Sequence, residues 1–135
     1  MEGERDVSTR GFSVVEVLVV LAILALLASI MIPRYASKRE QAYVAAKVSD
    51  LRNLGSSMET YYRVDGGEFG YTDDETVLGF IESEGVDVTI LETTPGGWSA
   101  RATHASTPWT CAYYFGDAEP VDPATRPGTP GCARP

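Results

Sequence analysis

A long apolar segment near the start of the chain limits what this sequence can fold into. Residues 12–32 contain a single charged side chain, Glu16, and the next charge is Arg34. As an α-helix these 21 residues would be about 31 Å long, which suffices to cross the hydrocarbon core of a bilayer. The sequence therefore predicts a membrane-spanning helix with one carboxylate near its start.

Two common kinds of apolar N-terminal segment do not account for Glu16. A cleaved signal peptide has a basic region, a shorter apolar run and small residues at its cleavage site. Here Arg5 and Arg10 are outnumbered by acidic residues, and no such site ends the run. A plain signal anchor leaves the carboxylate unexplained, since a charge at the membrane centre costs about 2.5–3.5 kcal/mol and usually has a partner. Glu16 thus requires a cation.

Gly11, Phe12, Glu16 and Pro33 together resemble the N-terminus of a type IV prepilin. In that family a dedicated peptidase cuts after the glycine and methylates the new N-terminal amine. The resemblance therefore implies cleavage between Gly11 and Phe12 and N-methylation of Phe12. Glu16 would be the fifth residue of the mature chain and Pro33 the twenty-second, both as in the family. The acidic leader, residues 1–11, departs from the usually basic leader of prepilins.

The prepilin pattern supplies the missing cation for Glu16. Cleavage creates a positive amine at Phe12, one helical turn away on the same face. In a filament, the resemblance implies that Glu16 pairs with the Phe12 amine of an adjacent subunit. Removing one partner of a buried pair costs about 3–5 kcal/mol, so such a pair specifies the axial register between apolar helices.

Residues 34–63 continue the helical pattern with a different character. Apolar residues recur there at steps of three and four, which is typical of an amphipathic helix: Val44, Val48, Leu51, Leu54, Met58 and Tyr61. Charged residues occupy much of the remaining circumference: Lys38, Glu40, Lys47, Asp50, Arg52 and Glu59. We expect one face to cover a core and the other to meet solvent, with a kink at Pro33.

The rest of the chain, residues 64–135, predicts a small head. Glycines at 66, 67 and 70 end the helical pattern and open a connector, residues 64–85, with a short helix or strand at 76–82. Alternating apolar residues then predict antiparallel strands at 85–94, 98–103 and 110–115. The expected fold is α+β and type IV pilin-like: a long N-terminal helix, its apolar half protruding, packed on a small antiparallel sheet.

The two cysteines, Cys111 and Cys132, flank a tail rich in proline and glycine. Beside an export segment they suggest a disulfide that closes this tail against the sheet, worth about 3 kcal/mol by loop entropy. Two free thiols are the alternative. A disulfide-bounded C-terminal loop also resembles the head of a pilin.

The sequence shows no pattern of catalytic, metal-binding or cofactor-binding residues. His104 is the single histidine, and no serine motif or phosphate loop accompanies it. The acidic runs 73–75 and 117–122 do not fit an EF-hand, so we interpret them as solvated patches. A formal charge of −8 argues against a nucleic-acid surface. We therefore expect neither an enzyme nor a cofactor.

The resemblance implies a structural subunit of a type IV pilus, divided into a leader (1–11), a transmembrane and filament-core helix (12–33), an amphipathic half-helix (34–63) and the head (64–135). Its partners would be other pilin subunits, the prepilin peptidase, and an inner-membrane assembly platform with its motor. It would cross the inner membrane once before assembly and end in an extracellular pilus or a periplasmic pseudopilus. The alternatives are a type II secretion pseudopilin and a non-polymerising, membrane-anchored extracytoplasmic binding protein.

Overall fold

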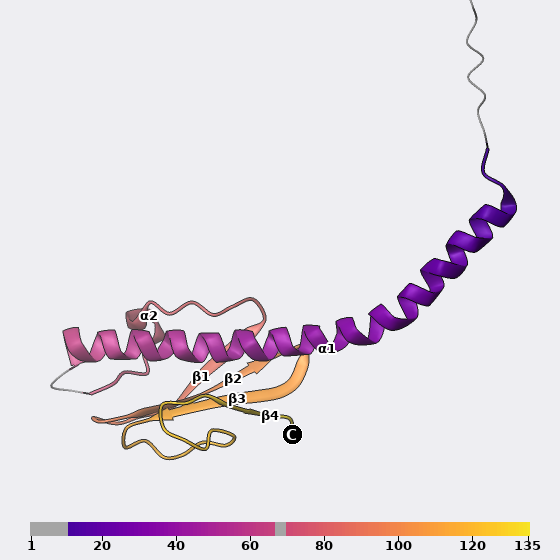
Figure 1. Cartoon of the computed structure of the whole chain (residues 1–135). Helices are drawn as coiled ribbons and strands as arrows, with labels where there is room; N and C mark the ends of the chain where they lie inside the picture. Colours follow the sequence, from indigo (N-terminus) through magenta and orange to yellow (C-terminus); the bar gives the residue numbers. More distant parts are fainter. Residues whose placement is uncertain (1–10, 67–69) are drawn as a thin grey trace, which may run out of the picture. The chain divides into compact units, whose positions relative to one another are not determined.

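The computed structural model of the chain describes residues 11–66 and 70–135 (Figure 1). The predicted leader, Gly11 excepted, lies outside the described residues. The chain divides into two compact units, Met1–Ser37 and Lys38–Pro135, and each is described by itself. One helix, α1 (Val14–Tyr61), contributes to both units.

In the first unit, α1 carries only exposed side chains. The helix begins at Val14, directly after Ser13, and it continues through Pro33. Proline has no backbone N–H, so one helical hydrogen bond is missing at that point. Pro33 therefore does not end the helix, and the kink expected there stays a prediction.

The second unit is an α+β head in which α1 packs on a four-stranded antiparallel sheet (Figure 1). The strands are β1 (Val86–Thr93), β2 (Trp98–His104), β3 (Thr107–Phe115) and β4 (Gly131–Ala133), hydrogen-bonded in chain order. Leu51, Leu54 and Met58 of α1 are buried against one face of the sheet. The predicted fold class, a long helix on a small antiparallel sheet, is confirmed.

The predicted strands are present, with differences at their ends. β1 and β2 match the alternating apolar patterns closely, because Val86 and Val88 of β1, like Trp98 and Ala100 of β2, face the helix. β3 begins at Thr107, earlier than predicted. The connector contains a short helix, α2 (Glu75–Leu78), whose first turn is capped by the Asp74 side chain, and a turn of π-helix (Tyr62–Gly66) follows α1.

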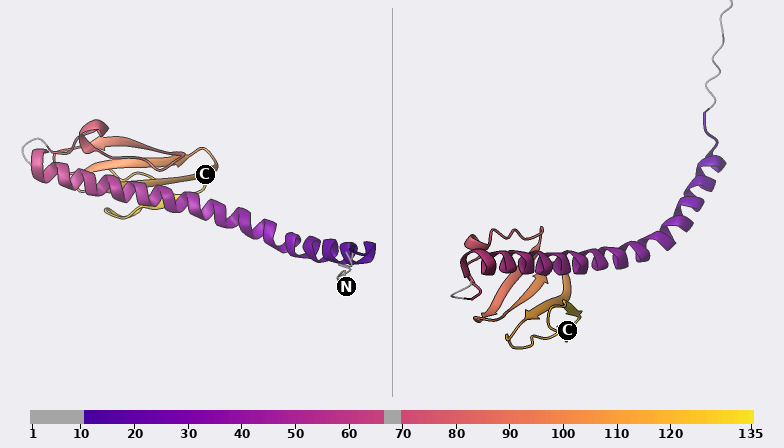
Figure 2. Two further views of the ribbon diagram at one scale, coloured as in Figure 1. Left: turned by 90° about the horizontal axis from the view of Figure 1, so that it is seen from above. Right: turned by 60° about the vertical axis from the view of Figure 1, so that its left-hand side comes forward.

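The C-terminal segment covers the opposite face of the sheet. Ala112 and Tyr114 of β3 point away from α1 and form a second small cluster with Ala124 and the partly buried Val121. Seen along a second direction, α2 lies on one side of α1, and the yellow loop that precedes the C-terminus emerges on the other (Figure 2, left). Since both faces are covered, the head has three layers: helix, sheet and C-terminal segment.

Candidate assembly site and head contacts

The predicted cleavage site lies outside the regular helix. Gly11, Phe12 and Ser13 precede α1, and Phe12 is 82% exposed. The Val15 amide donates to the Ser13 hydroxyl oxygen at 3.3 Å, and the Val17 amide donates to the Ser13 carbonyl at 3.2 Å. Ser13 thus caps the helix, which begins at Val14, two residues after Phe12. The bond between Gly11 and Phe12 is in exposed, non-helical backbone, where a peptidase has access.

Glu16 lies in the first turn of α1, where a negative charge is favourable. The backbone N–H groups of that turn have no partner further back in the helix and give this end a partial positive charge. The side chain of Glu16 is exposed. Phe12 lies outside the helix, two residues before Val14, so helix geometry does not set its distance from Glu16. The expected pairing of Glu16 with a Phe12 amine stays a prediction.

The apolar side chains of residues 12–32 are exposed as a continuous surface. By length and composition, α1 is the one helix in the described part of the chain that could cross a membrane. A large apolar surface of this kind marks a membrane or protein contact. Lipid tails and neighbouring apolar helices are equivalent surroundings for it.

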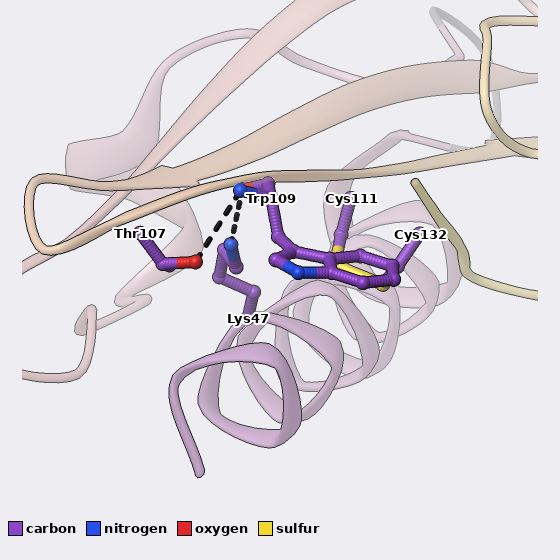
Figure 3. Close-up of a disulfide and its surroundings, with 5 residues drawn as sticks. All are labelled: Lys47, Thr107, Trp109, Cys111 and Cys132. Atoms are coloured by element: carbon purple, nitrogen blue, oxygen red, sulfur yellow. Dashed lines mark hydrogen bonds between the residues drawn. A yellow bond between two sulfur atoms is a disulfide. The ribbon is translucent and has the colours of Figure 1, made fainter. Parts of the chain in front are cut away.

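Lys47 and Asp50 are buried, which corrects the expectation that both occupy the solvent face of the helix. The Lys47 side chain is 0% exposed and its ammonium donates to the Trp109 carbonyl of β3 (Figure 3). Burial lowers the pKa of Lys47, and the negative charge of Glu40 opposes this shift. The signal was in the sequence: Lys47 precedes Leu51, Leu54 and Met58 at helical spacing, so it shares their face.

Asp50 ties the connector to the helix. Its two carboxylate oxygens accept hydrogen bonds from the backbone amide and the hydroxyl of Ser83, both at 2.8 Å. Because the carboxylate is buried, losing these donors would leave an unpaired charge in the core. This pair fixes the segment between α2 and β1 against α1.

Cys111 and Cys132 form a disulfide across the β3–β4 pair (Figure 3). The two residues are direct partners in the antiparallel register, with Cα atoms 4.1 Å apart. Cys111 is fully buried beneath α1. The bond therefore joins the short last strand to the helix-facing core.

An aromatic cluster fills the end of the head near the C-terminus of α1. Trp98 stacks on Tyr113 with ring centres 4.8 Å apart, and the ring of Trp98 lies over Gly55 of α1. Tyr71 stacks on Tyr62 and donates its hydroxyl to Glu59 at 3.0 Å. Burial, followed by this hydrogen bond, raises the pKa of Tyr71 to about 12.

The predicted acidic patches and His104 have structural contacts. Asp117 accepts a hydrogen bond from the Thr94 hydroxyl, and Glu92 accepts one from the Glu119 amide. The His104 ring packs on Tyr43, with centres 4.1 Å apart. Within residues 11–66 and 70–135, no three His, Cys, Asp or Glu side chains form a group that could hold a metal ion.

Comparison with known proteins identifies the N-terminal segment. The family described as "Prokaryotic N-terminal methylation motif" matches residues 8–32, which include the expected cleavage site and Glu16. This segment is the N-terminus of a type IV pilin-like protein. The chain's long helix packed on an antiparallel sheet agrees with this assignment.

Two curated relatives of this chain are both called "Type II secretion system core protein G". The protein from Pectobacterium carotovorum subsp. carotovorum is 32% identical over 71 residues, covering 53% of this chain and 45% of that protein. The protein from Dickeya chrysanthemi is 34% identical over 64 residues, covering 47% and 41%. The chain thus spans less than half the length of the curated relatives it matches.

Proposed function

We propose that this protein is a structural subunit of a type IV-class filament. In this proposal a prepilin peptidase cuts after Gly11 and methylates Phe12, and the mature chains polymerise through their N-terminal helices. The observation that carries the proposal is the matched motif joined to an exposed apolar helix with Glu16 in its first turn. No catalytic role is part of the proposal.

Before assembly, the apolar helix holds the subunit in the inner membrane. Assembly then transfers this surface from lipid to the helices of neighbouring subunits, so that one apolar environment replaces another. The energy of extraction comes from a motor on an inner-membrane platform. The pairing of Glu16 with a neighbour's Phe12 amine selects the register between subunits.

Two filaments are candidates for the assembled state. The printed names of the relatives favour the pseudopilus of a type II secretion system. The disulfide-bounded C-terminal segment favours a pilus, as in the pilin heads that the sequence resembles. Deleting the gene in the native host separates them: loss of protein secretion supports the pseudopilus, and loss of surface filaments supports the pilus.

Mass spectrometry of the N-terminal peptide, from protein recovered from its native host, tests the proposal itself. We expect a chain that starts at Phe12 and carries one added methyl group. A chain that retains the leader would contradict the proposal, because Glu16 would then lack the amine that neutralises it. The protein would in that case be an uncut membrane anchor.

A further inference from the structure

A groove on the head lies between α1 and one end of the sheet. It has a volume of about 610 Å³, and Trp98, Tyr113 and Phe115 contribute its aromatic part. The helical face that lines it consists of residues three and four positions apart: Arg52, Gly55, Ser56, Glu59 and Thr60 of α1, and Arg63 of the π-helical turn that follows. All of these residues belong to the second compact unit.

The charged residues of this groove make it positive on an acidic protein. Arg52 of α1 and Arg63 of the π-helical turn are both exposed. Glu59 lies between them, but its carboxylate accepts a hydrogen bond from Tyr71. The whole chain carries a formal charge of −8, so a groove with two arginines and one engaged carboxylate contrasts with its surroundings.

A second feature of the head has the complementary chemistry. No Lys or Arg occurs between Arg63 and Arg101. Within that stretch, residues 73–84 contain five exposed carboxylates: Asp73, Asp74, Glu75, Glu82 and Glu84. Ile81 in their midst is 85% exposed, and Val77 is 55% exposed. We call residues 73–84 the acidic segment; it presents apolar side chains flanked by negative charges.

We propose that the groove receives the acidic segment of a second copy of this chain. Ile81 would lie on the aromatic part of the groove, and the flanking carboxylates would pair with Arg52 and Arg63. An apolar centre with charges at its rim is the usual composition of a protein–protein contact. The inference rests on the proposed filament and adds a contact between heads to the contact between N-terminal helices.

The groove and the acidic segment are different surfaces that adjoin on α1. Ser56 and Thr60 line the groove and also line a smaller pocket with Val77 and Leu78 of α2. A contact between two different surfaces of the same subunit is heterologous. Repeated from copy to copy, it generates a ring or a helical filament rather than a closed dimer.

Charge reversal in the full-length protein tests the contact. The pair Arg52→Glu and Arg63→Glu places negative charges in the groove, against the acidic segment. The pair Asp73→Arg and Glu84→Arg places positive charges on the acidic segment, against the arginines of the groove. We expect either pair to lower filament yield in the native host at least about tenfold, because like charges in a contact cost several kcal/mol. All four changes in one chain should restore filaments. Arg101→Glu with Arg126→Glu, two exposed arginines outside the groove, is the matched control.

Cysteine cross-linking tests the same contact with changes at two exposed threonines. Thr60→Cys lines the groove and Thr76→Cys lies in the acidic segment. Because Thr60 lines a pocket with Val77 of its own chain, the two cysteines are placed in separate chains. Filaments assembled from a mixture of the two single variants should give covalent dimers on oxidation, whereas a mixture of Ser106→Cys and Thr76→Cys chains should not. Normal filaments with neither covalent dimers nor charge rescue would overturn this inference and leave the proposed function intact. Failure of the unaltered chain to form any filament would overturn both.

Discussion

At the scale of single residues, Gly116 shows how closely the turns of the head approach each other. It follows β3 with a φ of +65°, in the left-handed region that favours glycine. A Cβ atom at this position would lie 1.8 Å from the carbonyl oxygen of Gly96, in the turn between β1 and β2. The turn therefore depends on glycine for its backbone conformation and for the space beside it.

Gly116→Ala and Gly79→Ala separate these two requirements. Gly79 also has a positive φ, +59°, but open space surrounds its missing side chain. We expect Gly79→Ala to lower the free energy of unfolding by about 1–2 kcal/mol, the cost of a left-handed alanine. Gly116→Ala should cost about 1–3 kcal/mol more, because the backbone must also shift.

Denaturant unfolding of the two full-length variants in detergent, followed by near-ultraviolet circular dichroism, measures the difference. Equal losses of unfolding free energy in the two variants would show that the close approach of Gly116 to Gly96 does not add to the cost of the substitution.

The sequence predicted the sites whose residues lie close together in the chain. It did not predict contacts between residues that are far apart in the chain. Gly11, Phe12 and Glu16 form a pattern within six residues, so their spacing can be read directly. The spacing of Lys47 indicates its face of the helix, but its hydrogen-bond partner is a carbonyl 62 residues away, at Trp109. The groove likewise combines a helix face with β2, β3 and Gly128, and periodicity within one element does not predict it.

At the scale of secondary-structure elements, the last strand is the least self-sufficient part of the head. β4 has three residues and pairs only with β3. The segment before it contributes Ala124 and Val121 to the cluster on the far face of the sheet. The Cys111–Cys132 disulfide closes this segment into a loop and so reduces the entropy it gains on unfolding.

Removing the disulfide should loosen the C-terminal segment while the helix and the first three strands stay folded. For Cys111→Ala with Cys132→Ala we expect a loss of about 3 kcal/mol in unfolding free energy. We also expect faster proteolysis within residues 116–130. Denaturant unfolding and limited proteolysis measure the two effects.

The unaltered protein with its disulfide reduced is the control, because it keeps both cysteine side chains in the core. Equal unfolding midpoints for the reduced and oxidised protein would contradict the predicted role of the disulfide.

Periodicity explains which elements were predicted. The stripe Leu51, Leu54 and Met58, and the alternation in β1 and β2, repeat often enough to define a face. β4 has no such repeat, since three residues in a Gly- and Pro-rich tail carry no pattern. Its position follows from its pairing partner, Cys111, and not from its own sequence.

At the scale of the whole molecule, the chain separates two kinds of surface. Residues 12–32 expose an apolar helix, whereas the head exposes most of the acidic residues. The first surface suits lipid or other apolar helices, and the second suits water. In the proposed filament, Glu16 is the one charged side chain carried into the apolar part, where it meets the Phe12 amine of a neighbour.

Glu16→Ala tests that part of the proposal. We expect the variant to remain in the inner membrane, because the substitution makes the segment more apolar, and to form no filaments, because the neighbouring Phe12 amine loses its partner. Membrane fractionation and electron microscopy of sheared filaments measure the two outcomes.

Glu16→Gln, which keeps the shape without the charge, should fail in the same way. Asp87→Ala, which removes an exposed carboxylate from the head, should assemble normally. Filaments of normal length and number from Glu16→Ala would show that register is set elsewhere.

The position of Trp98 gives the head an internal optical probe. The chain contains two tryptophans, and Trp98, 1% exposed, lies between Gly55 of the helix and the ring of Tyr113. Replacing Trp109 by phenylalanine would leave one indole, whose emission reports whether helix and sheet are in contact. Because Trp98 also lines the groove, the same fluorescence would register an occupant there without any attached dye.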